Sequence, residues 1–307
     1  MQRGKKMFKP KLKYQPVRSF SVKEDGFFGE YYEPAEVRFP GKAMVVCSGS
    51  DGSFLLTRLG AEMFCEAGMP VIALAYWNAP GTPGDVVLSP VEYLQKACLW
   101  LKNKGYHPGV WGISLGGLYV LLSGSLFHEI ECVVAASPVH ILFQGGSFTH
   151  GLHFAGDSPF SFNGKGLPYV RAKDPKGVLK QTKRNLLRKR EPDMLFYYNM
   201  LKEPHDPAAD VKVENIKGPV LLISGGADVM VPAGWVCQEV MKRLDDNGFP
   251  YPHKHLHYEI LSHYTCPLRP MTSFMFRVER KHKKQCDENR AKSWEATLSF
   301  LAEEWKV

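Results

Sequence analysis

Residues 109–117 read GVWGISLGG, a Gly-x-Ser-x-Gly pattern between an apolar run and the helix-compatible run LYVLL at residues 118–122. The pattern is typical of a nucleophile elbow, in which a strand turns sharply into a helix and presents a serine at the turn. Gly112 and Gly116 lie two residues to either side of Ser114, where side chains would keep the strand and the helix apart. We therefore expect the Ser114 hydroxyl above the edge of a sheet, beside the Leu115 N–H at a helix N-terminus.

The same residues would also suit a glycine-rich turn around a buried, non-catalytic serine. The rest of the chain has to distinguish this turn from a nucleophile elbow. Apolar runs of strand length alternate with helical patterns along most of the sequence. Such alternation with short links predicts an α/β fold, with a mostly parallel, doubly wound sheet that carries helices on both faces. We predict strands at 43–47, 71–76, 131–136, 220–224 and 255–261, and helices at 55–67, 89–104, 234–246 and 288–305.

Two local signals refine this outline. The helix from residue 89 has a predicted serine cap at Ser89, a proline at its first position and Glu92 at its third. Residues 20–32 alternate around the turn dipeptide Asp25-Gly26, which predicts a short antiparallel hairpin at the sheet edge.

Residues 138–216 interrupt the strand–helix alternation of a domain that spans residues 18–307. This insertion is rich in aromatic residues, and it leaves and rejoins the sheet on the side of the strand ends. We predict that it forms a cap over the active site, with Phe143, Phe154 and Tyr169 in contact with substrate. A packing excursion without substrate contact is the alternative. Residues 1–17 are basic and contain two prolines, which predicts an arm on the surface.

Two later loops offer partners for the serine. A serine hydroxyl is a poor nucleophile unless a base removes its proton and a carboxylate orients that base. With an elbow of this kind the expected chain order is serine, acid, histidine. Asp228 follows the predicted strand 220–224 and His263 follows the strand that ends at residue 261, so both fall at strand ends in the required order. Taken singly, each would suit a turn aspartate or an ordinary loop histidine.

The loop after the first buried strand suits an oxyanion hole. Residues 48–53 are small, so backbone can approach a substrate closely. We expect a second N–H, beside that of Leu115, from Ser50 or Asp51. Asp51 precedes the serine in the chain, which argues against it as the triad acid.

Composition bounds the remaining possibilities. The 307 residues carry 39 basic and 31 acidic side chains, a formal charge of +8, but no nucleic-acid recognition module. Seven widely spaced cysteines without a Cys-x-x-Cys pair predict buried, reduced thiols. No apolar segment is long enough for a secretory signal or a membrane span, so we expect a cytoplasmic protein.

Three alternating histidines, His253, His255 and His257, would share one strand face. A solvent-exposed strand face explains this pattern better than a zinc site does, and we predict neither metal nor cofactor. The oligomeric state is not readable from the chain.

Five stretches carry a resemblance to a known family. The chain resembles the catalytic domain of the acyl-CoA thioesterase and bile acid-CoA:amino acid N-acyltransferase family, within the α/β-hydrolases and near dienelactone hydrolases. The resemblance covers most of residues 20–270 and implies Ser114, Asp228 and His263 as the triad and a fatty or bulky acyl thioester as substrate. The matching stretches are 73–78, 112–116, 164–169, 218–228 and 258–263.

The chain departs from the family pattern in four places. Animal members carry a β-sandwich domain before the catalytic domain, and here about 40 residues precede the first core strand. The conjugating enzyme has cysteine at the nucleophile position, so Ser114 favours hydrolysis over transfer to an amine. The acid is followed by Val229, where a second acid is frequent, and the histidine follows Ser262, where glycine is usual.

The function expected from the sequence is therefore hydrolysis of an acyl thioester through an acyl-enzyme on Ser114. The alternatives are an esterase on small esters, an N-acyltransferase and a non-catalytic binding protein of the same fold. The basic residues of 171–190 would meet the phosphates of coenzyme A or form a solvated helix face, whereas 281–284 is expected to be a surface charge run.

Overall fold

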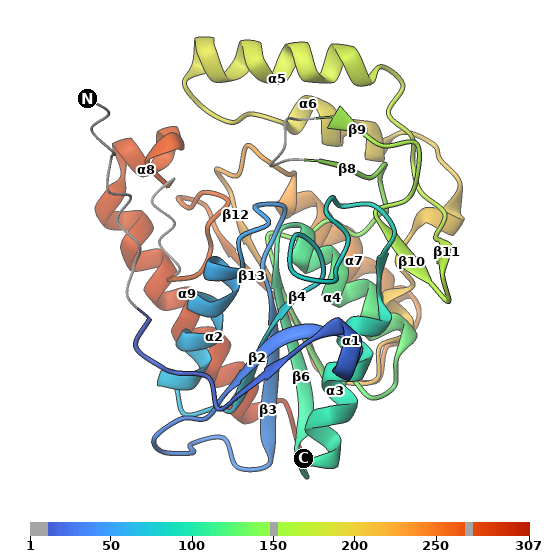
Figure 1. The fold of residues 1–307 in the computed structure, drawn as a ribbon. Coiled ribbons are helices and arrows are strands. Elements are labelled where there is room, and N and C mark those ends of the chain that lie inside the picture. The colour runs from blue at the N-terminus through green and yellow to red at the C-terminus, as the bar shows by residue number, and fades with distance from the viewer. Residues whose placement is uncertain (1–11, 148–152, 268–272) are drawn as a thin grey trace, which may run out of the picture.

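A central eight-stranded sheet organises the computed structural model, which describes residues 12–147, 153–267 and 273–307 (Figure 1). β1 pairs antiparallel with β2 and β2 antiparallel with β4, while all later neighbours are parallel. The prediction of a mostly parallel sheet is thus confirmed. In spatial order the strands are β1 (Arg18–Phe20), β2 (Phe28–Tyr32), β4 (Val71–Ala75), β3 (Lys42–Cys47), β6 (His107–Ile113), β7 (Cys132–Ala136), β12 (Val220–Gly225) and β13 (His253–Tyr258).

Helices cover both faces of this sheet, because the central strands are apolar on both. On one face Val45 and Val110 pack against α3 (Glu92–Asn103), α4 (Leu115–Leu126) and α7 (Ala233–Asp246). On the other face Met44, Val46 and Trp111 pack against α2 (Phe54–Glu66) and α9 (Lys283–Glu303). Successive residues of β3 therefore enter two separate cores, as strand geometry requires.

The sequence predictions locate most elements but place two helix starts wrongly. One is that of α9, which begins at Lys283 and not at residue 288. Ser89 does not cap a helix: Ser89–Pro90 form the short strand β5, which pairs with β10, and α3 begins at Glu92 after a Val91 N-cap. The insertion explains the difference, because the Ser89 N–H donates to Pro159 O at 2.9 Å and its backbone is committed to that pairing. β13 also ends earlier than expected, at Tyr258.

The edge of the sheet matches its prediction with one addition. β1 and β2 pair antiparallel as expected, but the one-turn helix α1 (Val22–Asp25) lies between them. Ser21 caps this turn by accepting a hydrogen bond from the Glu24 N–H, and Gly26 closes it with a φ of 78°.

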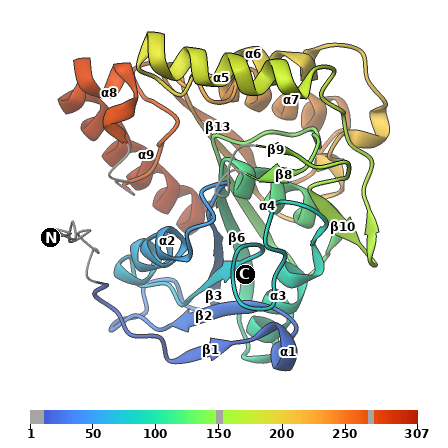
Figure 2. The same ribbon diagram turned by 45° about the horizontal axis from the view of Figure 1, so that its top comes forward.

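The insertion, residues 138–216, lies above the carboxyl ends of the parallel strands (Figures 1 and 2). Apart from one 15-residue helix, it consists of short elements joined by long connections, and the 3₁₀ turns 199–202, 207–209 and 213–215 lead back to β12. Its strands and helices are β8 (Gly146–Ser147), β9 (His153–Phe154), β10 (Phe160–Phe162), β11 (Lys165–Gly166), α5 (Pro175–Lys189) and α6 (Leu195–Tyr198). A 3₁₀ turn at 273–275 and α8 (Arg277–Lys281) precede α9.

Three predictions about the whole chain can be compared with this fold. All seven cysteine side chains are buried, as expected. No helix among residues 12–147, 153–267 and 273–307 is both long and apolar enough to cross a bilayer. Most of the predicted basic arm, residues 1–11, lies outside the described residues.

Candidate active site

Ser114 lies in the tight turn between β6 and α4, with φ 60° and ψ −121°, values that side-chain-bearing residues rarely adopt. The close approach on both sides of this turn requires glycine. A Cβ atom at Gly112 would lie 2.1 Å from Gly116 O, and one at Gly116 would lie 2.3 Å from Ser48 O. The turn places the serine at the N-terminus of α4.

Asp228 and His263 form a buried hydrogen-bonded pair. His263 Nδ1 lies 2.8 Å from Asp228 Oδ2, and both side chains are almost fully buried. The second carboxylate oxygen accepts hydrogen bonds from the backbone N–H groups of Met230 and Val231, at 2.9 and 3.1 Å. One oxygen of Asp228 therefore fixes its own loop, while the other orients the imidazole through Nδ1, so Nε2 takes no part in this contact.

The histidine loop is anchored at the strand ends beside the serine. The Ser114 N–H donates to Ala136 O at 2.8 Å, and the next residue, Ser137, donates from its hydroxyl to His263 O at 2.9 Å. The Ser114 hydroxyl itself makes no hydrogen bond to any described residue, His263 included. Hydrogen bonds between a nucleophile and its base are often long outside the substrate complex and tighten within it.

The loop after β3 passes directly over Ser114. A Cβ atom at Gly49 would lie 3.0 Å from the Ser114 Cβ and 3.5 Å from its Oγ. Two aromatic side chains hold this loop, since Tyr76 OH donates to Ser48 O at 3.0 Å and Trp77 Nε1 to Gly49 O at 3.4 Å. The backbone beside Ser114 is therefore held in place before any substrate enters.

The N–H groups of this loop divide into used and unused donors. Gly49 donates to Asp51 Oδ2 at 3.1 Å and Ser53 donates to Asp51 Oδ1 at 2.7 Å. The Asp51 carboxylate thus folds back onto its own loop, and desolvation raises the pKa of this carboxyl. The N–H groups of Ser50 and Leu115 donate to no acceptor within the described residues, so both remain available to an oxyanion.

A buried ion pair behind His263 gave no signal in the sequence. Ser262 Oγ donates to Glu279 Oε1 at 2.6 Å. Arg290 binds the same carboxylate through two nitrogens, at 2.6 and 3.0 Å, and each side chain of this pair is only 4% exposed. The three residues come from a loop and from the charge-rich segments α8 and α9, where a buried pair cannot be told from surface charges. Ser137 was likewise missed, because a serine after a strand has no distinctive pattern.

The three aromatic residues predicted to contact substrate have different surroundings. Phe143 is buried, and its ring packs edge-on against Tyr197 and Tyr198. Phe154 is partly buried, with its ring centroid 5.4 Å from that of Tyr197. Tyr169 donates to Gly156 O at 2.9 Å, and the guanidinium group of Arg171 lies over its ring. Burial, together with the Asp228 carboxylate, raises the pKa of Tyr198.

The alternating histidines of β13 bond to neighbouring side chains. Ser224 Oγ lies 2.7 Å from His255 Nε2 and 2.8 Å from His257 Nδ1, while His253 Nε2 lies 2.9 Å from an Asp245 oxygen. Across the described ranges, no group of three or more histidine, cysteine, aspartate or glutamate residues has the arrangement of a metal site.

Comparison with known proteins connects this geometry to one family. The family model described as BAAT / Acyl-CoA thioester hydrolase C terminal matches residues 89–304. Human mitochondrial acyl-coenzyme A thioesterase 2 is 27% identical over 244 residues, which cover 78% of this chain and 44% of that protein. Mouse bile acid-CoA:amino acid N-acyltransferase is 28% identical over 155 residues, 50% of this chain and 34% of the relative. The chain thus spans about half, or less, of the length of these relatives.

Solved structures agree on the fold. An esterase from Pyrococcus furiosus superposes with a TM-score of 0.52 at 17% identity, over 96% of this chain and 92% of the esterase. At that identity the likeness concerns architecture alone, and it supports the α/β-hydrolase fold expected from the elbow.

Proposed function

Because the chain belongs to the BAAT / acyl-CoA thioester hydrolase C-terminal family, we propose that it is a serine hydrolase that cleaves an acyl-coenzyme A thioester. Its acyl group would pass through an ester on Ser114, with His263 as the base and Asp228 as the group that orients the base. The observation that carries the proposal is the buried Nδ1–carboxylate contact of 2.8 Å, which commits the imidazole to a single tautomer.

The first half-reaction transfers the acyl group to the enzyme. His263 Nε2 takes the Ser114 hydroxyl proton as Oγ bonds to the thioester carbonyl carbon. The carbonyl π electrons move to oxygen, and the N–H groups of Leu115 and Ser50, or Asp51 in its place, hold the resulting oxyanion. When the C–S bond breaks, the thiolate of coenzyme A leaves and takes the proton from the imidazolium.

The second half-reaction releases the acid. His263 removes a proton from a water molecule, which attacks the Ser114 ester through a second oxyanion. The C–O bond breaks, the proton returns to Ser114 Oγ, and a carboxylic acid is released. An amine in place of this water would give an amide, which is the transferase alternative. Serine at position 114 favours water, because an oxygen ester retains less acyl-transfer potential than a thioester.

A substrate panel tests the proposal. Hydrolysis rates are compared on acyl-CoA thioesters and on matched oxygen esters over several chain lengths, with and without glycine as an amine acceptor. Faster cleavage of thioesters supports the proposal, while faster cleavage of small oxygen esters favours the esterase alternative. An amide product with glycine would make the protein a transferase.

A pair of serine variants accompanies the panel. Ser114→Ala is expected to lower kcat by about 10⁴-fold or more, as loss of a triad nucleophile does. Ser123→Ala is the matched control, because Ser123 is fully buried in the same helix. Comparable rates for Ser114→Ala and an active parent protein would reject Ser114 as the nucleophile, whereas no hydrolysis by the parent protein itself would favour a binding protein of this fold. The cytoplasmic location stays a prediction.

A further inference from the structure

A cleft of about 610 Å³ lies between the C-terminal end of α5 and α8, which are neighbours in both views (Figures 1 and 2). It joins two basic runs that lie almost 90 residues apart in the sequence. Its lining contains six cationic and two acidic side chains, namely Arg188, Lys189, Arg190, Arg277, Arg280, Lys281, Glu191 and Asp193.

Most of the positive charge in this cleft is not neutralised by the protein. Asp193 pairs with Lys189, and the Glu191 carboxylate accepts the backbone N–H of Arg277 at 2.8 Å. Within the described residues no carboxylate contacts the side-chain cations of Arg188, Arg190, Arg277 or Lys281. These cations are therefore free to bind an anion.

One arginine, Arg280, links the two walls of the cleft through hydrogen bonds to backbone carbonyl groups. Arg280 Nη1 donates to the carbonyl oxygens of Arg190, Phe274 and Met275, at 3.2, 2.9 and 2.7 Å. This guanidinium ties the end of α5 to α8 and positions the basic side chains on both walls. It is a positioning residue, since its contacts are with backbone.

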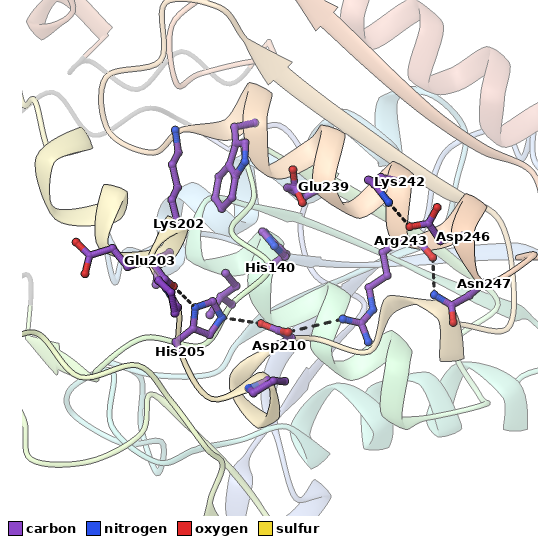
Figure 3. Close-up of a pocket in the computed structure, with 15 residues that line it drawn as sticks. His140, Lys202, Glu203, His205, Asp210, Glu239, Lys242, Arg243, Asp246 and Asn247 are labelled. Carbon is purple, nitrogen blue, oxygen red and sulfur yellow. Dashed lines mark hydrogen bonds and ion pairs between the residues drawn. The ribbon is translucent and has the colours of Figure 1, made fainter.

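A second cavity of similar size shows what an electrically balanced site looks like in this protein. It measures about 620 Å³ and lies between the insertion and α7 (Figure 3). Arg243 binds Glu214 at 2.6 and 2.7 Å, while Lys242 pairs with Asp246. Paired charges of this kind leave little attraction for an anion, so the α5–α8 cleft is the stronger candidate.

Both walls of the cleft are attached to the loops that carry the proposed catalytic residues. The Met194 N–H, next to Asp193, donates to Val229 O at 2.9 Å, and Val229 follows the acid. On the other wall the ring of Phe276, next to Arg277, lies 5.5 Å from that of Tyr264, which follows the histidine. A ligand in the cleft would thus lie beside both catalytic loops.

We propose that the α5–α8 cleft binds the phosphate groups of the coenzyme A portion of the thioester. The inference rests on the proposed function and adds the site that selects this leaving group. Coenzyme A carries a diphosphate and a separate phosphate on its ribose, and guanidinium groups bind phosphate oxygens in pairs. The end of the 171–190 run and Lys281 of the 281–284 run then act together, which the sequence did not suggest.

The test compares two double variants with equal loss of charge. Arg188→Gln/Arg277→Gln removes one unpaired cation from each wall of the cleft. Lys180→Gln/Arg184→Gln removes two exposed cations of α5 that do not line it. Calorimetry with coenzyme A, and kinetics with an acyl-CoA and with the matching acyl-pantetheine, which lacks the nucleotide phosphates, are run on both variants and the parent protein.

We expect the cleft variant to bind coenzyme A at least about 10-fold more weakly, with a similar rise in KM for acyl-CoA. Its kcat and its kinetics with acyl-pantetheine should match the parent protein, which also shows that it is folded. The control variant should match the parent throughout. Unchanged coenzyme A affinity in the cleft variant, or an equal loss in the control, would overturn the inference.

Two further outcomes separate the possible failures. If inorganic phosphate binds the cleft as tightly as coenzyme A does, the cleft is a general anion site and the inference fails. If the parent protein hydrolyses neither thioester, the proposed function itself has failed, whatever binds in the cleft.

Discussion

The elbow, residues 112–117, and the insertion, residues 138–216, make different demands on the sequence. In the elbow, backbone approaches backbone so closely that only glycine fits at Gly112 and Gly116. The insertion contains both kinds of position: a Cβ atom at Gly146 would lie 2.3 Å from His153 O, whereas one at Gly156 would have no neighbour within 4 Å. Close backbone packing therefore surrounds Ser114 on both sides, while the insertion also has open positions where side chains can vary.

From this difference we predict which kinetic or stability parameter a substitution in each region should change. Changes in and around the elbow should alter kcat or the stability of the whole domain. Changes in the insertion should alter KM, chain-length preference or a local response to pH. Four tests, each with its own variants, address that division.

The largest effect is expected from the acid that orients the base. Asp228→Asn keeps the oxygen that accepts the Met230 and Val231 N–H groups, but its amide would oppose the His263 Nδ1–H. We expect kcat to fall by about 10⁴-fold with little change in KM, since a triad with the wrong tautomer loses this much. Steady-state kinetics measure the change, and Glu259→Gln, an exposed carboxylate near His257, is the control. A fall of less than 10-fold would remove Asp228 from the mechanism.

A glycine pair compares the packing of the two regions. Gly116→Ala would place its Cβ 2.3 Å from Ser48 O and should destabilise the domain by about 3 kcal/mol, the upper range for overpacking. Gly156→Ala should change the free energy of unfolding by less than about 0.5 kcal/mol. Urea denaturation of both variants measures the difference. Equal losses at the two positions would contradict the contrast between the regions.

A histidine of the insertion gives a pH test. Burial lowers the pKa of His140 to about 4; the nearby Asp210 carboxylate opposes this shift, while His205 and Arg243 add to it. In the unfolded chain a histidine titrates near its ordinary value of about 6.5, so the unfolded state takes up the proton first as the pH falls. The free energy of unfolding should therefore fall between pH 7 and pH 5, by up to about 2 kcal/mol from this group.

His140→Phe removes the titrating group and keeps a ring against Trp235, whose centroid lies 5.4 Å away. Denaturation at pH 7 and pH 5 should show a smaller loss of stability for this variant than for the parent protein. The exposed His128, changed to Asn, is the control. If both variants keep the full pH dependence, His140 is not its source.

The smallest effect concerns acyl selectivity. Phe154→Ala should raise KM about five-fold for long acyl chains and leave short chains unchanged, the equivalent of roughly 1 kcal/mol of lost apolar contact. Phe162→Ala is the control, because this partly buried aromatic of the insertion packs against Phe127. A kcat effect without a KM effect, or an equal response in Phe162→Ala, would separate Phe154 from the substrate.

The sequence predicted the features that depend on local pattern. The positions of the core strands could be anticipated because buried strands are continuous apolar runs, and Ser114 because two glycines bracket it. Asp228 and His263 were identifiable from their places after strands, and the structure puts them in hydrogen-bond contact.

Features made by residues far apart could not be predicted in the same way. Ser89 has the local pattern of a helix cap, yet pairing with β10, about 70 residues away, takes it into a strand. Glu279 and Arg290 belong to charge-rich helical segments, where nothing local shows that they are buried behind His263. The α5–α8 cleft needs two basic runs to meet, which only the fold arranges.

The account depends above all on an activated Ser114, and one measurement addresses it directly. The parent protein is treated with a fluorophosphonate probe, and the modified residue is located by peptide mass spectrometry. We predict a single adduct on Ser114, with the rate of labelling reduced by orders of magnitude in His263→Ala. No adduct on the folded protein, or an adduct on a different serine, would contradict the account.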